Sequence, residues 1–493
     1  MIYNFNLGIG WASSGVEYAQ IYRARMFRNI GVDAKFVFTD MFPQENIEHM
    51  TKNIGFLDSE VIWLYTFFTD FKTAPVTYTL SDLEKTFTNQ EYTKKREGKI
   101  CRYVFGGSNN FYTAYMVNDH DDFVHRVELV SNGCLIRKDY FTYGRVYSEY
   151  YAPLDNAAHL YHRRFFNENG SVAYEEIIDD DRVMYKFKDK ILCSKEEFVG
   201  YMVSQLHLTK DDVVLIDRST DIGQSILMNC KPARVGTVVH ADHFSEKDTN
   251  DDYILWNNFY EYEFNMHKHI DFYICSTQAQ SDLMVQQFEK YYGVTPCVYT
   301  IPVGSLPELK YPSSTRKPYS LITASRLASE KHVDWICKAV IQARTEVPEL
   351  SLDIYGEGGE KSKLETIIRE NNASSYIHLM GQHDLSEVYQ NYEAYIAGST
   401  SEGFGLTLME AVGGGLPIIG FDVRYGNPTF VRDGENGYLI PLPEEDKDRI
   451  EALRKRIVDL FKQDLEKCHS VSYLVAKDFL TSNVQEKWRE AVC

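Results

Sequence analysis

The sequence predicts an α/β protein with two parallel-sheet domains and an antiparallel β-sheet inserted into the first of them. Three observations carry this prediction: a β-loop-α-β opening, a middle region rich in tyrosine and phenylalanine, and a last third in which apolar strands alternate with helices. A length of 493 residues agrees with roughly three domains. We place them at residues 1–74 continued by 191–300, at the insertion 75–190, and at 301–493.

The opening of the chain predicts a strand, a loop and a helix. An apolar strand at residues 2–5 leads into a glycine-containing loop at 8–15, and apolar positions then recur three and four apart until Gly31. A second strand follows at 35–39. The loop suits a phosphate group, but Ser13 stands where G-x-G-x-x-G needs its third glycine, so a dinucleotide fingerprint is not supported.

The insertion predicts antiparallel strands. Short alternating runs lie at residues 102–105, 111–117, 123–130 and 183–187. Asn132-Gly133 and Asn169-Gly170 predict tight turns, because Asn-Gly supplies the positive φ angles that hairpins need. Two interpretations of its aromatic residues stay open: a platform for an acceptor or partner, and an ordinary β core.

The α/β pattern then resumes with strands at residues 213–216, 235–240 and 272–275 and a helix at 278–292. Residues 301–307 are rich in residues that end regular structure and predict a linker. The last domain begins near Tyr319, with strands at 320–324, 350–355, 377–380, 395–397 and 417–421 and a final helix over 475–492. These strands predict a doubly wound parallel sheet, whose ligand sites lie at the carboxyl ends of its strands.

Composition and charge exclude several classes of protein. Lys and Arg number 52 against 71 Asp and Glu, and the net charge of −19 argues against general nucleic-acid binding. No secretory signal is visible, and the most apolar stretch, 61–68, is far shorter than the ~20 residues of a spanning helix. Nine scattered cysteines without a C-x-x-C pair predict free thiols in a reducing cytoplasm, and no cluster predicts a metal site.

The most informative motif runs from Gly398 to Ala411, directly after a predicted strand. Gly403 and Gly405 permit close backbone approach, and a helix beginning near Phe404 offers N–H groups to phosphate. Glu402 and Glu410 lie eight residues apart, so they can face one cleft at different depths.

Two more candidate segments lie at the carboxyl ends of predicted strands. Arg326 and Lys331 lie five residues apart after the first strand of the last domain, where two cations can stabilise a leaving diphosphate. His240, in the run Val238 to His243, can hydrogen-bond to a sugar hydroxyl across the cleft from Glu402.

Together these motifs resemble retaining glycosyltransferases of family 4, which have the GT-B fold of two Rossmann-like domains. Their E-x7-E motif resembles Glu402 to Glu410, and their diphosphate-binding Arg and Lys resemble Arg326 and Lys331. The β insertion and the opening NLGIGWASSG narrow the resemblance to the GtfA family of the accessory secretion (accessory Sec) system of Gram-positive bacteria. That family adds the first N-acetylglucosamine to Ser or Thr of serine-rich repeat adhesins, with a non-catalytic GtfB-like partner.

The resemblance implies roles for individual residues. Arg326 and Lys331 hold the UDP diphosphate of the donor UDP-GlcNAc, Glu410 holds the ribose, and His383 borders the uracil. The donor sugar meets Glu402, with His240 opposite, and the backbone of the run Gly403, Phe404, Gly405 and Leu406. Ser14 and Gly15 border the diphosphate and acceptor.

The resemblance also implies retention of configuration without a metal cofactor, and a cytoplasmic protein that is peripheral at the inner face of the membrane.

Two alternative functions are open. One is a wall teichoic acid α-glycosyltransferase of the TarM type, which the charge of −19 disfavours because its acceptor is a polyanion. The other is a non-catalytic sugar-binding chaperone, which should lack the Arg, Lys and paired Glu present here.

Overall fold

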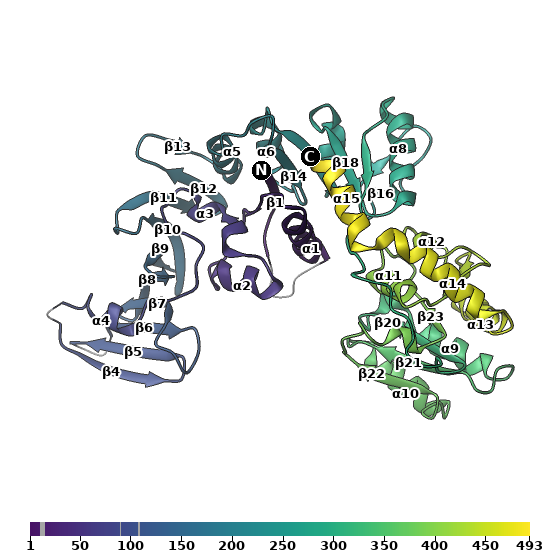
Figure 1. The fold of residues 1–493 in the computed structure, drawn as a ribbon. Coiled ribbons are helices and arrows are strands. Elements are labelled where there is room, and N and C mark those ends of the chain that lie inside the picture. The colour runs from purple at the N-terminus through teal and green to yellow at the C-terminus, as the bar shows by residue number, and fades with distance from the viewer. Residues whose placement is uncertain (10–14, 89, 107–108) are drawn as a thin grey trace. The chain divides into compact units, whose positions relative to one another are not determined.

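The structure, a computed structural model, describes residues 1–9, 15–88, 90–106 and 109–493 (Figure 1). By their contacts these residues form two compact units. The first unit comprises Met1–Val238 and Trp256–Asp271, and the second comprises Val239–Leu255 and Phe272–Cys493. The domain boundaries drawn from the sequence stay a prediction.

A parallel sheet in the first unit confirms the predicted opening. Strand β1 (Ile2–Asn6) is followed by helix α1 (Gly15–Ile30) and strand β2 (Ala34–Phe38), and the sheet has the order β15-β14-β1-β2-β3 within this unit. Gly31, with φ +71°, ends α1 as predicted. Part of the predicted loop, residues 10–14, lies outside the described residues. The remaining elements are α2 (Ile47–Ile54), η1 (Asp58–Glu60), β3 (Val61–Trp63), α3 (Leu64–Phe67), α5 (Lys195–Gln205), β14 (Val213–Ile216), α6 (Gly223–Asn229), β15 (Arg234–Val239), α7 (Glu261–Asn265) and η2 (His267–His269).

The insertion folds as an antiparallel meander in which each strand from β4 to β13 pairs with its sequence neighbour. Asn132 and Gly133 have φ of +50° and +80° in the turn between β7 and β8, as predicted. In Figure 1 the sheet runs from β13, beside α5, to β4 at its far end. Its elements are α4 (Leu80–Glu84), β4 (Tyr92–Glu97), β5 (Ile100–Phe105), β6 (Phe111–Met116), β7 (Val124–Ser131), β8 (Cys134–Phe141), β9 (Arg145–Leu154), β10 (Ala157–Phe166), β11 (Val172–Asp179), β12 (Arg182–Lys186) and β13 (Ile191–Leu192).

Many aromatic residues of the insertion are core residues. Tyr147 stacks on Tyr140 at 4.3 Å and on Phe165 at 5.4 Å between ring centroids, and Phe165 stacks on Tyr65 of the parallel-sheet part at 5.7 Å. Tyr147 and Phe165 are buried. These rings join the meander to the parallel sheet, so for them the β-core interpretation holds.

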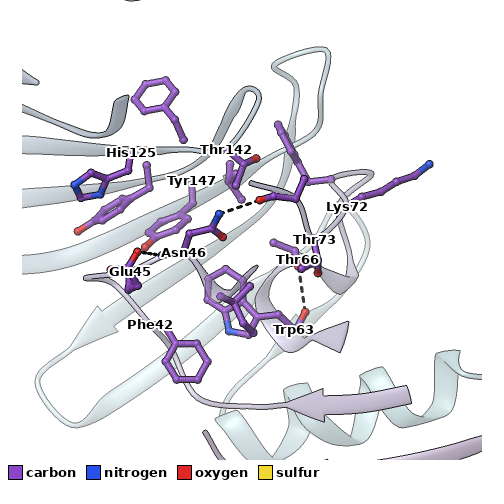
Figure 2. Close-up of a pocket in the computed structure, with 16 residues that line it drawn as sticks. Phe42, Glu45, Asn46, Trp63, Thr66, Lys72, Thr73, His125, Thr142 and Tyr147 are labelled. Atoms are coloured by element: carbon purple, nitrogen blue, oxygen red, sulfur yellow. Dashed lines mark hydrogen bonds between the residues drawn. The ribbon is translucent and has the colours of Figure 1, made fainter. Parts of the chain in front are cut away.

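A pocket lies at this joint, with Trp63 on one side and His125, Thr142 and Tyr147 on the other (Figure 2). Asn46, at its edge, accepts a hydrogen bond from the backbone N–H of Glu48 and donates one to the carbonyl of Ala74 at 2.9 Å. Its side-chain amide therefore caps α2 and fixes the segment after α3, which is a structural role.

The parallel sheet of the second unit confirms the predicted doubly wound domain. Its order is β22-β21-β20-β23-β24-β25, and all of its strand pairs are parallel. Neighbouring residues alternate between two cores: Leu321 and Ile419 belong to one, Ile322 and Ile418 to the other. This alternation is what burial on both faces by helices requires.

Each strand predicted for this part of the chain is present, whereas β16, β17, β19 and β25 were not predicted. The elements of the second unit are β16 (Phe244–Ser245), β18 (Phe272–Cys275), α8 (Gln278–Tyr292), β19 (Val298–Thr300), β20 (Ser320–Ala324), η3 (Ser329–Lys331), α9 (Val333–Ala343), β21 (Ser351–Tyr355), α10 (Lys361–Glu370), β22 (Ile377–Gly381), η4 (Tyr389–Asn391), β23 (Ala394–Ile396), α11 (Leu406–Gly413), β24 (Ile418–Phe421), α12 (Gly426–Phe430), β25 (Gly437–Ile440) and α13 (Asp446–Leu460), while β17 (Leu255–Trp256) lies at the boundary of the units.

The prediction of one final helix over 475–492 is wrong. The chain forms α14 (Leu465–Ala476), a 3₁₀ turn η5 (Lys477–Phe479) and α15 (Thr481–Val492). The break occurs where the segment 301–307 packs: the N–H of Leu306 donates to the carbonyl of Phe479 at 2.8 Å, and the N–H of Thr481 donates to that of Leu306 at 2.9 Å. Those bonds to another segment replace helical ones.

Among the described residues, no helix combines the length and the apolarity that crossing a membrane requires. All nine cysteines are free thiols, as predicted, and five of them are buried.

Glu263 in the first unit predicts a dependence of stability on pH. Its side chain is 1% exposed, and burial raises the pKa of this carboxyl to about 7. The folded protein therefore binds this proton more tightly than the unfolded chain, and the stability it contributes is present below about pH 4.5 and lost as the pH rises through 7. We expect Glu263→Gln to remove a decline of about 3 kcal/mol between pH 5 and 8, measured by urea unfolding at each pH. An unchanged decline in the variant would contradict this.

Candidate functional site

Two loops meet at the carboxyl edge of the second unit's sheet. Strand β20 leads into the segment 325–331, and β23 leads into the segment 397–405. The two strands are neighbours in the sheet, with Leu321 opposite Ala394 and Ile322 opposite Tyr395. Because parallel strands end at one edge, the predicted cation segment and the predicted Glu402 segment lie side by side.

Lys331 and Glu402 form the centre of the site. The Lys331 Nζ donates to Glu402 Oε2 at 2.6 Å, and each side chain is 21% exposed. Partial burial of the pair strengthens its attraction relative to a surface ion pair. The structure thus brings together two residues that lie 71 positions apart in the sequence.

Gly398 allows the two loops to approach. A methyl group at Gly398 would lie 2.8 Å from the carbonyl oxygen of His332 and 3.0 Å from that of Lys331. A side chain would therefore push the Lys331 segment away. Two further glycines lie in the segment after β21, next to the segment 325–331. A Cβ at Gly356 would lie 1.9 Å from the carbonyl oxygen of Ser325, and Gly358 has a φ of +158°.

A buried tyrosine fastens the loops together. The hydroxyl of Tyr395 lies 2.9 Å from the carbonyl oxygen of Ala324 and 3.0 Å from Oγ1 of Thr407, so it connects the end of β20 to the first turn of α11. Burial raises the pKa of Tyr395 to about 12, which keeps the hydroxyl a hydrogen-bond donor at neutral pH.

Helix α11 starts at the loop, two residues later than predicted. Gly405, with φ +87°, is its N-cap, and Leu406, which is 40% exposed, is its first residue. The first turn of a helix leaves N–H groups without partners inside the helix, which suits a phosphate or a sugar hydroxyl. The side chain of Phe404 instead packs in the core on Phe430, at 5.3 Å between ring centroids, so only its backbone can face a ligand.

Glu410 lies farther along the same helix and is exposed as a residue, although its carboxylate end is partly enclosed. The Tyr389 hydroxyl donates to its Oε2 at 2.9 Å, and desolvation of this end raises the pKa of the Glu410 carboxyl. Tyr389 was not predicted. The two glutamates of the motif thus have different partners, Lys331 for Glu402 and Tyr389 for Glu410.

His240 and His243 lie on the segment after β15. A Cβ at Gly403 would be 3.8 Å from the carbonyl oxygen of His240, so the backbone of His240 lies beside the Glu402 loop, and its contact with a sugar stays a prediction. His243 is fully buried and its Nε2 lies 2.7 Å from Oε1 of Gln287. Burial lowers the pKa of His243 to about 4, so it is neutral at physiological pH.

Two further predicted residues of the second unit, Arg326 and His383, have partners other than Lys331 and Glu402. Arg326 has a side chain that is 74% exposed and pairs with Glu330 at 2.8 Å. His383 is exposed, edge-to-face with Tyr355 at 5.8 Å. Gly15 is the exposed first residue of α1 in the first unit, and Ser14 lies outside the described residues. Their roles stay predictions.

The described residues contain no group of three or more His, Cys, Asp or Glu side chains that could hold a metal ion. Lys331 and Glu402 supply the paired charges of the site.

Two known families match the chain. Residues 93–189 match the "GtfA extended beta-sheet domain", and residues 310–474 match "Glycosyl transferases group 1". The first match covers most of the antiparallel meander, and the second contains both loops of the site.

Full-length relatives are also similar. The chain is 53% identical to the UDP-N-acetylglucosamine–peptide N-acetylglucosaminyltransferase GtfA subunit of Streptococcus gordonii, over 99% of this chain and 97% of that protein. It resembles the crystal structure of a GtfA/B complex (TM-score 0.96, 53% identity, 100% and 99% covered). It also resembles the pneumococcal O-GlcNAc transferase GtfA in complex with UDP and GlcNAc (TM-score 0.85, 50% identity, 100% and 98% covered).

A more distant relative bears on the acceptor. The poly(ribitol-phosphate) alpha-N-acetylglucosaminyltransferase of Staphylococcus aureus is 23% identical over 69% of this chain and 70% of that protein.

Proposed function

Because the chain belongs to the GtfA family of UDP-N-acetylglucosamine–peptide N-acetylglucosaminyltransferase subunits, with the GT-B fold, we propose that it transfers N-acetylglucosamine from UDP-N-acetylglucosamine to a polypeptide. The acceptor groups are Ser and Thr hydroxyls of a serine-rich repeat adhesin. The contact between Lys331 and Glu402 carries the proposal, because it places a cation and a carboxylate at the carboxyl edge of the sheet, beside the start of α11.

Donor binding would exchange partners within this site. Lys331 and Arg326 would turn to the diphosphate, and Glu402, no longer paired with Lys331, would accept hydrogen bonds from sugar hydroxyls. Both cations have room to do so, since Arg326 is exposed and Lys331 is partly exposed. Glu410 would bind the ribose from its position along α11, and His383 would border the uracil.

The reaction would retain the configuration at the anomeric carbon. The acceptor oxygen attacks that carbon on the face from which the UDP oxygen departs, so one C–O bond forms as another breaks. A phosphate oxygen of the leaving UDP takes the hydroxyl proton. Lys331 and Arg326 would stabilise the negative charge that develops on the diphosphate, which is the role of a metal ion in other transferases. Glu402 would stabilise positive charge at the anomeric carbon. We therefore propose a metal-independent enzyme.

A partner subunit is part of the proposal. The family's crystal structure of a GtfA/B complex supports a GtfB-type partner for this chain. We also propose that the protein works in the cytoplasm, at the inner face of the membrane, and its free thiols suit a reducing compartment.

Two other functions receive less support. A teichoic acid acceptor is suggested by the S. aureus relative, but the identity is 23% and the net charge of −19 opposes a polyanion. A non-catalytic sugar-binding role does not explain why Arg326, Lys331, Glu402 and Glu410 are all present.

One experiment separates these functions. The protein and a GtfB-type subunit are incubated with radiolabelled UDP-N-acetylglucosamine and, in parallel, with a serine-rich peptide or with poly(ribitol phosphate). We expect label on the peptide and UDP release in that tube. Label only on the polymer would favour the teichoic acid function, and donor binding without turnover on either would favour the non-catalytic one.

A further inference from the structure

The main chain of Glu402 is held by the loop 424–426. The N–H of Glu402 donates to the carbonyl of Arg424 at 3.1 Å, and the N–H groups of Tyr425 and Gly426 donate to the carbonyl of Glu402 at 2.5 and 2.7 Å. Gly426 also touches the side chain, since a Cβ there would lie 2.8 Å from Cγ of Glu402. The position of Glu402 is therefore set by this loop as well as by Lys331.

The loop is anchored by the side chain of Tyr425. This side chain is 1% exposed, and its hydroxyl lies 3.3 Å from Nδ1 of His243. His243 in turn lies 2.7 Å from Gln287 through Nε2, and it is neutral. A neutral imidazole has one donor and one acceptor nitrogen, so it can bridge Tyr425 and Gln287 at the same time.

Arg424 adds a weaker anchor. Its Nη2 lies 2.9 Å from Oε2 of Glu246, and its guanidinium carbon lies 4.9 Å from the centre of the Phe244 ring. Glu246 is 76% exposed, so water screens this pair, and the buried tyrosine is the stronger anchor.

One short segment therefore connects the two residues that are expected to contact the donor sugar, His240 and Glu402. Residues 240–246 begin at His240, whose carbonyl faces Gly403, and contain His243, which holds Tyr425. We propose that Tyr425, His243 and Gln287 are positioning residues, which fix the Glu402 main chain relative to His240 so that the carboxylate meets the anomeric centre correctly. This inference rests on the proposed function for its catalytic consequence.

The test is Tyr425→Phe, which removes the hydroxyl and keeps the ring. We expect kcat for UDP release from UDP-N-acetylglucosamine to fall roughly ten- to a hundredfold, because small displacements of reacting groups cost about this much. The KM for the donor and the affinity for UDP should stay within about threefold, because the groups that bind the diphosphate are untouched. The control is Tyr438→Phe in β25, which removes a buried hydroxyl that accepts a hydrogen bond from Gln463.

Hydrogen exchange makes the test independent of turnover. In Tyr425→Phe and in His243→Ala the amides of Glu402, Tyr425 and Gly426 should exchange at least tenfold faster, and in Tyr438→Phe they should not. Unchanged exchange, a wild-type kcat in Tyr425→Phe, or an equal loss in the control would overturn the inference. If exchange changes as expected but the wild-type protein releases no UDP with any acceptor, the proposed function fails and the positioning role stands.

Discussion

Replacing Glu402 by glutamine is expected to lower kcat for UDP release about a thousandfold, because in the proposed mechanism its charge stabilises the anomeric carbon in the transition state and the variant lacks that charge. The amide has nearly the same shape, so the hydrogen bonds of the main chain to Arg424, Tyr425 and Gly426 should persist. The KM for UDP-N-acetylglucosamine should change little by comparison, because the lost interaction is made in the transition state. The measurement is steady-state UDP release with peptide and partner subunit present.

A matched change elsewhere provides the control. Glu451 pairs with Arg454 at 2.6 Å in α13, and Glu451→Gln removes the same charge from a pair on the surface. We expect its kcat to equal that of the wild type. Retention of more than a tenth of the activity in Glu402→Gln would refute the role of its charge, and a loss in both variants would point to a general effect of net charge.

Several strands of the parallel sheets could be predicted to the residue because they are continuous apolar runs that end at polar or turn residues. The bounds 213–216, 272–275 and 320–324 and the helix 278–292 agree with β14, β18, β20 and α8. Local sequence sufficed there, since burial on both faces demands apolar residues at every position. The break after Ala476 could not be predicted, because it depends on Leu306, about 170 residues earlier in the chain.

The site could be predicted at the level of loops. The strand ends place Lys331 and Glu402 at one edge, but the ion pair itself depends on side-chain conformations that no spacing encodes. Tyr389, Tyr395 and Tyr425 were missed because a tyrosine that fixes a loop resembles a core tyrosine in sequence. Gly356 and Gly358 had a signal, a glycine cluster directly after a predicted strand, and it was not used.

A buried ion pair in the first unit predicts the largest loss of stability. Arg23 of α1 contacts Asp217 after β14 through two hydrogen bonds, of 2.6 and 2.9 Å, and their side chains are 2% and 0% exposed. Gln20 donates to the same carboxylate at 2.8 Å, and Asn4 of β1 accepts from Arg23 at 2.8 Å. This network ties α1 to β1 and to the end of β14.

Removing the Asp217 carboxylate leaves the Arg23 guanidinium charged and buried. The free-energy cost of taking that charge out of water is then no longer offset by the ion pair. We expect Asp217→Ala to lower the free energy of unfolding by about 3–5 kcal/mol, measured by urea unfolding, and to speed amide exchange along α1. The double variant Arg23→Met, Asp217→Leu should recover most of this loss, since apolar residues of similar volume often replace a buried pair without cost. In contrast, Glu97→Ala removes a pair with Lys95 whose side chains are 71% and 79% exposed, and should leave the urea midpoint nearly unchanged. Equal effects of Asp217→Ala and Glu97→Ala would mean that water reaches the Arg23 guanidinium, and that α1 is held to the sheet by its apolar face alone.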